Sequence, residues 1–261
     1  MSFKKRNSDS NQEQKRIHAY VATPAYDGRV MTDYALSMTE AAGAAALMGI
    51  QVTAAVMGNG AFIEIARCNF VRMFLETECT HLFFIDSDLK FEARGFVGLL
   101  MANKPVSAGM YRRRQEPEDY PVKLTPWHDG GGLWVDDDGW VMCDRVPTGF
   151  LCIRRDVIEA MAAEAPILAI EKQPEAPLLF DTQRIPIEGR KVTFLGEDFS
   201  FCDNYVKQFG EPIHVWPDID FVHGGYKCNF AKYLNSEVER EQAEKQAAEA
   251  QAGTGAEGEA A

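Results

Sequence analysis

The sequence lacks the cysteine spacings that mark a disulfide framework or a structural zinc site. Its six cysteines include no Cys-x-x-Cys pair and follow no regular spacing. Small disulfide-rich domains and zinc sites depend on such spacings. We therefore expect unpaired, buried thiols in a reducing compartment.

Long apolar segments are also absent. Residues 1–15 are polar and charged, without the apolar stretch of a signal peptide, and no run elsewhere is long enough to span a bilayer. No internal repeat is visible. These absences predict a cytoplasmic protein that does not enter a membrane.

An excess of positive charge is missing as well, since the formal net charge is −12. A chain of this charge is not expected to bind polyanions non-specifically. Beyond the basic leader, the densest basic run is Arg112-Arg113-Arg114, and any nucleic acid partner would have to use such a local patch.

What the sequence does contain, from residue 16 to about residue 110, is a regular alternation of strand and helix patterns. Strand patterns cover residues 18–23, 51–57, 81–86 and 105–110, and helical spacing covers residues 30–48, 61–78 and 92–101. This order predicts an α/β fold with a mostly parallel central sheet flanked by helices.

The pattern changes after residue 110. Residues 111–147 are rich in Pro, Gly and Trp and predict a loop-and-hairpin region, the usual place for a substrate lid. A strand at 149–153, a helix at 156–163, a Pro-rich loop at 166–190 and a last unit at 192–215, with a helix from about Glu197, follow. We expect one domain over residues 16–235, with a nucleotide-binding half (16–110) and an acceptor half (111–235). It lies between a disordered basic leader (1–15) and an acidic tail (236–261) that fades from helix to disorder.

The strongest chemical signal is Asp86-Ser87-Asp88, which follows the apolar run Leu82–Ile85. In extended geometry the two carboxylates would point the same way, at the carboxyl end of a buried strand, where open α/β sheets bind ligands. Two hard oxygen ligands there suit Mg²⁺ or Mn²⁺ bound to a diphosphate. The alternative is a turn with solvated acids, but a buried strand that ends in paired carboxylates favours a compensating cation.

Two further segments carry candidate chemistry. Glu197 and Asp198 follow Gly196 at a strand-to-helix corner, where acids either stabilise the first helical turn or supply a general base. His223 precedes a Gly pair after a strand-like run and is either structural or a metal ligand.

Residues near the first strands are candidates for nucleotide contact. Tyr26 could stack on a base and Asp27 could accept a hydrogen bond from a base edge or ribose, although Thr23–Gly28 could also be a simple βα turn. Arg67 is either a solvated helix residue or a phosphate or nucleobase contact. The acidic run at residues 136–138 predicts a hairpin turn rather than a calcium loop, because no twelve-residue ligand pattern follows it.

Taken together, these segments resemble the GT-A glycosyltransferases, in particular the compact phage-encoded type related to family 2. The resemblance covers roughly residues 17–230 and rests on TPAYDG, Arg67-Cys-Asn69, FFIDSD, AGMYRRR, PTGFLCIRRDVI, GEDFSFCDNY and His223-Gly-Gly. It implies a GT-A, Rossmann-like sheet with a small antiparallel region on the acceptor side.

The resemblance also implies roles for individual residues. Asp86 would contact the nucleoside ribose and, with Asp88 and His223, the metal, while Asp198, beside Glu197, would be the catalytic base. The donor pocket would be lined by Thr23, Pro24, Tyr26, Asp27, Arg67, Ser87 and Gly149. Phe150, with Arg112 and Arg113, would face the acceptor. The implied donor is a nucleotide-sugar, with a UDP-sugar favoured, and the implied cofactor is Mn²⁺ or Mg²⁺.

The acceptor stays open at this stage. Phage-type relatives suggest a hydroxymethylated base in DNA, which would have to be flipped out of a duplex, and would place the protein in the host cytoplasm. The alternative acceptors are a surface polysaccharide, a lipid or a protein. A phosphatase of the haloacid dehalogenase type shares the strand that ends in Asp-x-Asp, and a non-catalytic sugar- or nucleotide-binding module is a third interpretation.

Overall fold

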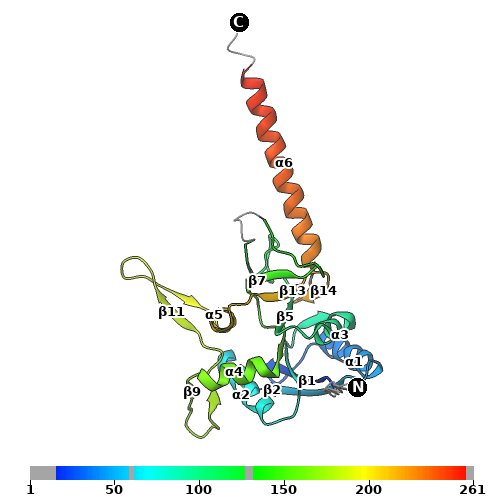
Figure 1. Ribbon diagram of the computed structural model, residues 1–261, viewed down its shortest axis with the longest axis vertical. Helices are drawn as coiled ribbons and strands as arrows, with labels where there is room; N and C mark the ends of the chain where they lie inside the picture. The colour runs from blue at the N-terminus through cyan, green and yellow to red at the C-terminus, as the bar shows by residue number, and fades with distance from the viewer. Residues whose placement is uncertain (1–15, 59–61, 127–131, 257–261) are drawn as a thin grey trace, which may run out of the picture.

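The computed structural model describes residues 16–58, 62–126 and 132–256, with side chains to residue 248. The predicted basic leader lies outside this range. The largest element of the protein is an eight-stranded sheet (Figure 1). The strands are β1 (His18–Ala25), β2 (Gln51–Gly58), β3 (His81–Ile85), β5 (Val106–Gly109), β6 (Lys123–Leu124), β7 (Val141–Arg145), β8 (Phe150–Arg154) and β13 (Ile213–Trp216). They lie in the order β2-β1-β3-β8-β5-β13-β7-β6.

Six of these eight strands point the same way. β1 is parallel to β2 and β3, and β13 is parallel to β5. β8 runs antiparallel to both β3 and β5, and β7 runs antiparallel to β13 and β6. Only β8 and β7 are therefore reversed within this sheet, and the predicted α/β fold with a mostly parallel sheet is confirmed.

Helices flank the sheet near the lengths that the apolar spacing predicts. They are α1 (Thr32–Leu47), α2 (Ile63–Leu75), α3 (Ala93–Ala102), α4 (Arg155–Glu164) and α5 (Glu197–Phe209). α1 packs against α3, α2 contacts β1, and α5 contacts β7. Gly98 of α3 shows how close this packing is, since a Cβ there would lie 1.8 Å from the ring of Trp216 in β13.

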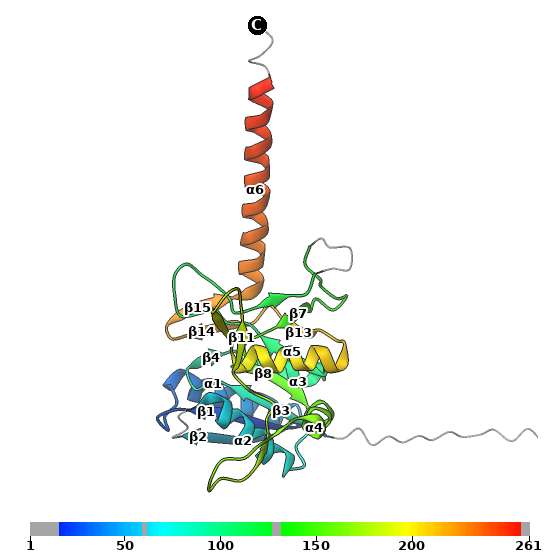
Figure 2. The same ribbon diagram turned by 90° about the vertical axis from the view of Figure 1, so that its left-hand side faces the viewer.

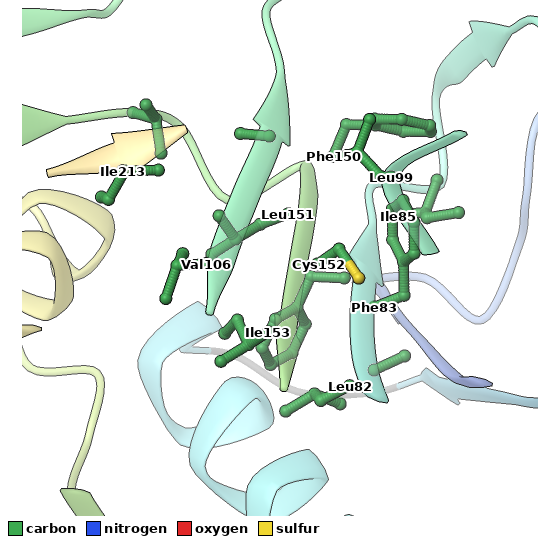
Figure 3. Packing of buried hydrophobic residues seen from close by; sticks show 14 of the residues in the cluster. Leu82, Phe83, Ile85, Leu99, Val106, Phe150, Leu151, Cys152, Ile153 and Ile213 are labelled. Carbon is green, nitrogen blue, oxygen red and sulfur yellow. The ribbon is translucent and has the colours of Figure 1, made fainter. Parts of the chain in front are cut away.

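The core is centred on β3 and β8. All five residues of β3 are buried, as the apolar run predicts, and four of the five in β8 are buried as well. Figure 3 shows Phe83 and Phe150 among these side chains, and their ring centroids lie 4.9 Å apart. All six cysteines are buried and unpaired, as expected.

A second, three-stranded sheet begins immediately after β3. It consists of β4 (Leu89–Phe91), β14 (Asp220–His223) and β15 (Tyr226–Asn229), in the order β15-β14-β4. The prediction that Asp86-Ser87-Asp88 is extended is wrong, because the chain turns there and the Leu89 amide donates to the Asp86 carbonyl at 3.3 Å. The turn is needed because β4 leaves the central sheet to pair with β14, which brings Leu89 opposite His223.

The segment predicted as a Pro-rich loop contains short strands. β9 (Ile167–Leu168) pairs with β10 (Ala176–Pro177), and β11 (Gln183–Pro186) pairs with β12 (Val192–Leu195). The β11–β12 hairpin stands out from the body beside α5 (Figure 1).

The C-terminal segment forms one long helix, α6 (Phe230–Ala256), which runs away from the body in both views (Figures 1 and 2). The predicted helical part of the tail is therefore present. Among the described helices, none is both long and apolar enough to cross a membrane.

Candidate functional site

A buried arginine joins the first acid of the Asp86-Ser87-Asp88 turn to the N-terminus of α5. Arg67 of α2 is 4% exposed. Its Nη2 donates to Asp86 Oδ1 at 3.3 Å, and its Nε donates to Glu197 Oε1 at 3.2 Å. Burial works against the charge on Arg67, but the Asp86 and Glu197 carboxylates outweigh it and raise its pKa. Arg67 is therefore not a solvated residue, and its Nη2 and Nε are not free to bind a phosphate. Instead, they hold the carboxylates of Asp86 and Glu197 in place.

The other oxygen of Asp86 is held from the opposite side. The Tyr111 hydroxyl donates to Asp86 Oδ2 at 3.2 Å and accepts from the Gly149 amide at 3.0 Å. The Asp86 amide in turn donates to the Gly149 carbonyl at 2.9 Å. Burial, with the negative charge of Asp86, raises the pKa of Tyr111 well above its ordinary value, so the phenol stays a donor.

Gly149 is required by this arrangement. A Cβ at this position would lie 2.1 Å from the Tyr111 hydroxyl and 2.3 Å from Asp86 Oδ2, distances that no side chain can tolerate without moving one of them. The backbone of Gly149 thus lies directly against the Asp86 carboxylate. That Gly149 lines the donor pocket stays a prediction.

Asp88, the second acid of the turn, faces β14 instead. Its Oδ2 lies 3.6 Å from Nε2 of His223 and 2.9 Å from Nη1 of Arg114. The neighbouring His223 ring lowers the pKa of Asp88 against the effect of burial, and the charge of Arg114 adds to this. Asp88 is therefore a carboxylate, and a cation already sits beside it.

The tautomer of His223 follows from its second contact. Nδ1 lies 2.8 Å from the Arg112 carbonyl oxygen, which can only accept, so Nδ1 carries a proton. In the neutral ring, Nε2 then presents a lone pair toward the Asp88 carboxylate. Two electron-rich atoms that face each other at 3.6 Å call for a proton or a cation between them.

This donor pair fits a divalent cation that keeps part of its shell open. A metal-bound His commonly donates its other N–H to a backbone carbonyl, as His223 does. Within the described ranges, no three His, Cys, Asp or Glu side chains group closely enough to hold a metal ion. Asp88 and His223 would therefore hold an ion that depends on waters and substrate oxygens for its remaining ligands, as Mg²⁺ typically does.

Glu197 and Asp198 differ sharply although they are adjacent in the first turn of α5. Glu197 pairs with Arg67 and its side chain is 14% exposed. Asp198 accepts from the Phe199 amide at 2.7 Å, but burial and then the charge of Glu197 raise its pKa from 3.8 to about 6. A carboxyl with this pKa can exchange a proton near neutral pH, whereas Glu197 is committed to Arg67.

The predicted donor-pocket residues are partly brought together. Pro24 and Tyr26 join Asp86, Ser87 and Asp88 along a cleft of about 380 Å³ that also reaches the start of α2. Tyr26 is 77% exposed, which leaves its ring free to stack.

Two other residues predicted for the donor pocket have local roles. Thr23 is fully buried and its hydroxyl bonds to Tyr34. Asp27 accepts from the Arg29 amide at 3.0 Å, as in an ordinary turn. Neither side chain lines the cleft.

The residues predicted to meet the acceptor are engaged within the protein. Arg112 is 6% exposed, lies over the Tyr226 ring and pairs with Glu116 at 3.1 Å. Arg113 pairs with Asp119 at 2.7 Å. Phe150 is fully buried in the core. The Arg112–Arg114 run is thus balanced by three carboxylates, those of Glu116, Asp119 and Asp88.

Tyr111 is a site residue that the sequence did not indicate, and Arg114 was predicted only as part of the Arg112-Arg113-Arg114 basic run. Both lie in the run Met110–Arg114, which follows β5 at the carboxyl edge of the sheet. Their position just after β5 was the available signal, because β3 and β5 run in the same direction and their ends meet at one edge of the sheet.

Comparisons with known proteins give a coarse likeness only. No family model and no curated protein sequence matches the chain. Among solved structures, GalNAc-T7 with UDP, GalNAc and Mn²⁺ is similar over 82% of this chain and 45% of that chain, at 9% identity and a TM-score of 0.41. The inositol-1-phosphate CTP transferase from T. maritima is similar over 80% of this chain and 89% of that chain, at 10% identity and a TM-score of 0.39. The chain thus spans less than half the length of the GalNAc-T7 chain. Both TM-scores lie below 0.5, so the function has to be argued from the site itself.

Proposed function

We propose that the protein is a metal-dependent glycosyltransferase that moves a sugar from a UDP-sugar to an acceptor hydroxyl. One observation carries the proposal. A single turn at the carboxyl edge of the sheet holds a rigidly fixed Asp86 and an Asp88 that faces the Nε2 of His223. Next to this turn lies a cleft, and Asp198 has a pKa suited to proton transfer.

The donor half of the reaction belongs to the Asp86–Asp88 turn. Asp86 is held by Arg67 and Tyr111, so its carboxylate is preorganised to accept hydrogen bonds from a ribose without first losing side-chain freedom. Tyr26, which also lines the cleft, would stack on the nucleobase. A divalent cation held by Asp88 and His223 would, when bound, offset the charge that develops on the departing diphosphate.

The acceptor half of the reaction belongs to Asp198. The attacking hydroxyl must lose a proton as the new glycosidic bond forms, and Asp198 would take it as the general base. Glu197 pairs with Arg67, and its charge is, after burial, the next cause of the raised pKa of Asp198. The two acids thus have separate roles, with Glu197 tuning the pKa and Asp198 accepting the proton.

The favoured acceptor is the hydroxyl of a 5-hydroxymethylated pyrimidine in DNA. Such a base offers a primary hydroxyl on a planar ring and would have to leave a duplex to reach Asp198. A panel of nucleotide-sugars, each incubated with DNA that contains or lacks 5-hydroxymethylpyrimidine, tests this acceptor by nucleoside mass spectrometry. A glycosylated nucleoside is expected only with the modified DNA, and its absence with every donor would remove DNA as the acceptor.

The reaction class is tested separately. Purified protein with Mn²⁺ should slowly hydrolyse UDP-glucose or another UDP-sugar and should leave p-nitrophenyl phosphate intact. Release of phosphate from p-nitrophenyl phosphate without turnover of any nucleotide-sugar would instead identify a phosphatase and refute the proposal.

A further inference from the structure

The β11–β12 hairpin presents an exposed apolar face beside the helix that carries Asp198. Register pairs Arg184 with Phe194 and Pro186 with Val192, and alternation along the strands places these four side chains on one face. Phe194 is 63% exposed and Val192 is 54% exposed. A two-stranded ribbon with such a face gains little stability alone in water.

At the base of the hairpin, the opposite face ties it to α5. Leu195 on this face is buried, and Gln183 donates from Nε2 to the Ser200 hydroxyl at 2.8 Å. Only Gly196 separates the end of β12 from Glu197, the first residue of α5. The exposed face therefore has a fixed relation to Asp198, and Figure 1 shows the hairpin projecting into solvent next to this helix.

The hairpin also carries cations that are not neutralised. Arg184, Arg190 and Lys191 lie in residues 183–195, against one acid, Glu188. Within the described part of the chain, these three cations form no salt bridge with a carboxylate, whereas Arg112, Arg113 and Arg114 each form one. The Arg184 guanidinium lies 5.9 Å from the centre of the Phe194 ring. On a chain of net charge −12, this is a local positive surface that runs from the tip of the hairpin toward its base, where β12 leads into α5.

We propose that this hairpin binds the acceptor and that it holds a single-stranded or locally opened polynucleotide; the inference rests on the proposed function. Phe194 offers an aromatic face on which a base can stack, and Arg184, Arg190 and Lys191 offer charge to the phosphates. A strand that follows this face is led toward Asp198, where an extruded base can present its hydroxyl.

The arrangement favours a polynucleotide over a lipid surface. A membrane-inserting hairpin would carry its apolar side chains at the tip, but the tip here is Ile187-Glu188-Gly189-Arg190-Lys191, which is mostly polar and charged. The aromatic ring lies at the base of the hairpin instead, four residues from Asp198. A base can stack on Phe194 near the base of the hairpin, while Arg190 and Lys191 at the tip can pair with phosphates farther along the same strand. This spacing suits an extended nucleic acid chain.

Binding of a fluorescein-labelled single-stranded DNA oligonucleotide, followed by fluorescence anisotropy, tests the inference without any catalytic step. Phe194→Ser should weaken binding by about 5- to 100-fold, and Phe194→Trp should retain it, since a base can stack on either ring. The double change Arg190→Gln with Lys191→Gln should lower the slope of log affinity against log salt by about 1.4. The matched control, Lys207→Gln with Lys227→Gln, removes the same charge elsewhere on the surface and should leave binding as in the wild type. Melting temperatures check that every variant is folded.

The outcomes separate this inference from the proposed function. The inference is overturned if the wild type binds no oligonucleotide, if Phe194→Ser binds as tightly as Phe194→Trp, or if vesicles of anionic lipid are bound through Phe194 in place of DNA. UDP-sugar hydrolysis by the wild type is measured in parallel and does not depend on the hairpin. UDP-sugar hydrolysis without DNA binding would support the proposed glycosyltransferase activity and refute DNA binding by the hairpin. DNA binding through Phe194 without turnover of any nucleotide-sugar would refute the proposed reaction but support the hairpin as a DNA-binding surface.

Discussion

The adjacent carboxyls of Glu197 and Asp198 offer a matched pair of substitutions, Glu197→Gln and Asp198→Asn. Each replaces a carboxylate by its amide in the same turn of α5, so helix propensity and size hardly change. The structure nevertheless predicts opposite effects on stability, because Glu197 is paired with Arg67 and Asp198 is buried beside a like charge.

The magnitude for Asp198 follows from its pKa. Burial raises this pKa from 3.8 to about 6, so between these pH values the folded protein holds a proton that the unfolded chain has released. Stability therefore falls as the pH rises through this window, and above it the folded state carries a cost of about 3 kcal/mol. Asn has no charge to bury, so Asp198→Asn should recover up to about 3 kcal/mol at pH 7.5 and nothing below pH 3.8.

For Glu197 the sign is reversed. Gln can still accept a hydrogen bond from Arg67, but a charge-assisted bond is exchanged for a neutral one, at a cost of about 1 kcal/mol. Removing the Glu197 charge also removes one cause of the raised pKa of Asp198, so that pKa should move down toward its ordinary value.

Urea denaturation of the wild type and both variants at pH 4, 6 and 7.5 measures these differences. The gap between Asp198→Asn and the wild type should widen from pH 4 to pH 7.5. Sugar transfer by the wild type should rise with pH through about 6, because the base must be ionised, and Asp198→Asn should lose about 100-fold or more. The reasoning fails if Asp198→Asn is the less stable protein at pH 7.5, or if the gap does not depend on pH.

Three further substitutions test other contacts. Gly149→Ala would place a Cβ 2.1 Å from the Tyr111 hydroxyl and should displace Asp86, lowering UDP-sugar hydrolysis by about 100-fold; an unchanged rate would show that Asp86 need not be fixed. His223→Ala removes one proposed metal ligand and should raise the Mn²⁺ concentration for half-maximal hydrolysis at least about tenfold, and the same half-maximal concentration in both proteins would exclude this role. Gly98→Ala in α3 would press a methyl group into Trp216 and should cost about 1–3 kcal/mol in urea denaturation, while hydrolysis at 25 °C stays unchanged. Unaltered stability would mean that α3 can shift.

Much of the fold follows from local patterns. The continuous apolar run before Asp86 predicts a strand buried on both faces, and β3 is fully buried. Apolar spacing also locates α1, α2 and α3. The position of β8 does not follow from such patterns, because the run Phe150–Arg154 predicts a strand but not its neighbours, and here it pairs with both β3 and β5.

The candidate site is harder to predict because its geometry depends on partners that are distant in sequence. A fully extended Asp86-Ser87-Asp88 was expected from the strand alone, but pairing of β4 with β14 requires a turn, which sends Asp86 toward Arg67 and Asp88 toward His223. The same turn explains why Asp88 and His223 lie close together. The resemblance implies that both bind the metal, but the sequence alone gives no physical reason for their proximity.

Charge patterns in the sequence do not predict which charged side chains are free to bind a ligand. Arg112-Arg113-Arg114 has the composition of a phosphate-binding patch, yet each arginine meets a carboxylate once the chain is folded. The hairpin cations are spread over residues 184–191 and form no dense run, yet among the described residues they form no salt bridge with a carboxylate. Which charges are free is decided by neighbours in space, and a single sequence does not show these.

The most direct test of the central claim is UDP-sugar hydrolysis in a Mn²⁺ titration, with wild-type protein and Asp88→Asn compared side by side. The wild type should gain activity with Mn²⁺ and lose it in EDTA, and Asp88→Asn should stay inactive at every Mn²⁺ concentration although its melting temperature shows a folded protein. Full activity of the wild type in EDTA, or Mn²⁺-stimulated activity of Asp88→Asn equal to that of the wild type, would contradict the account.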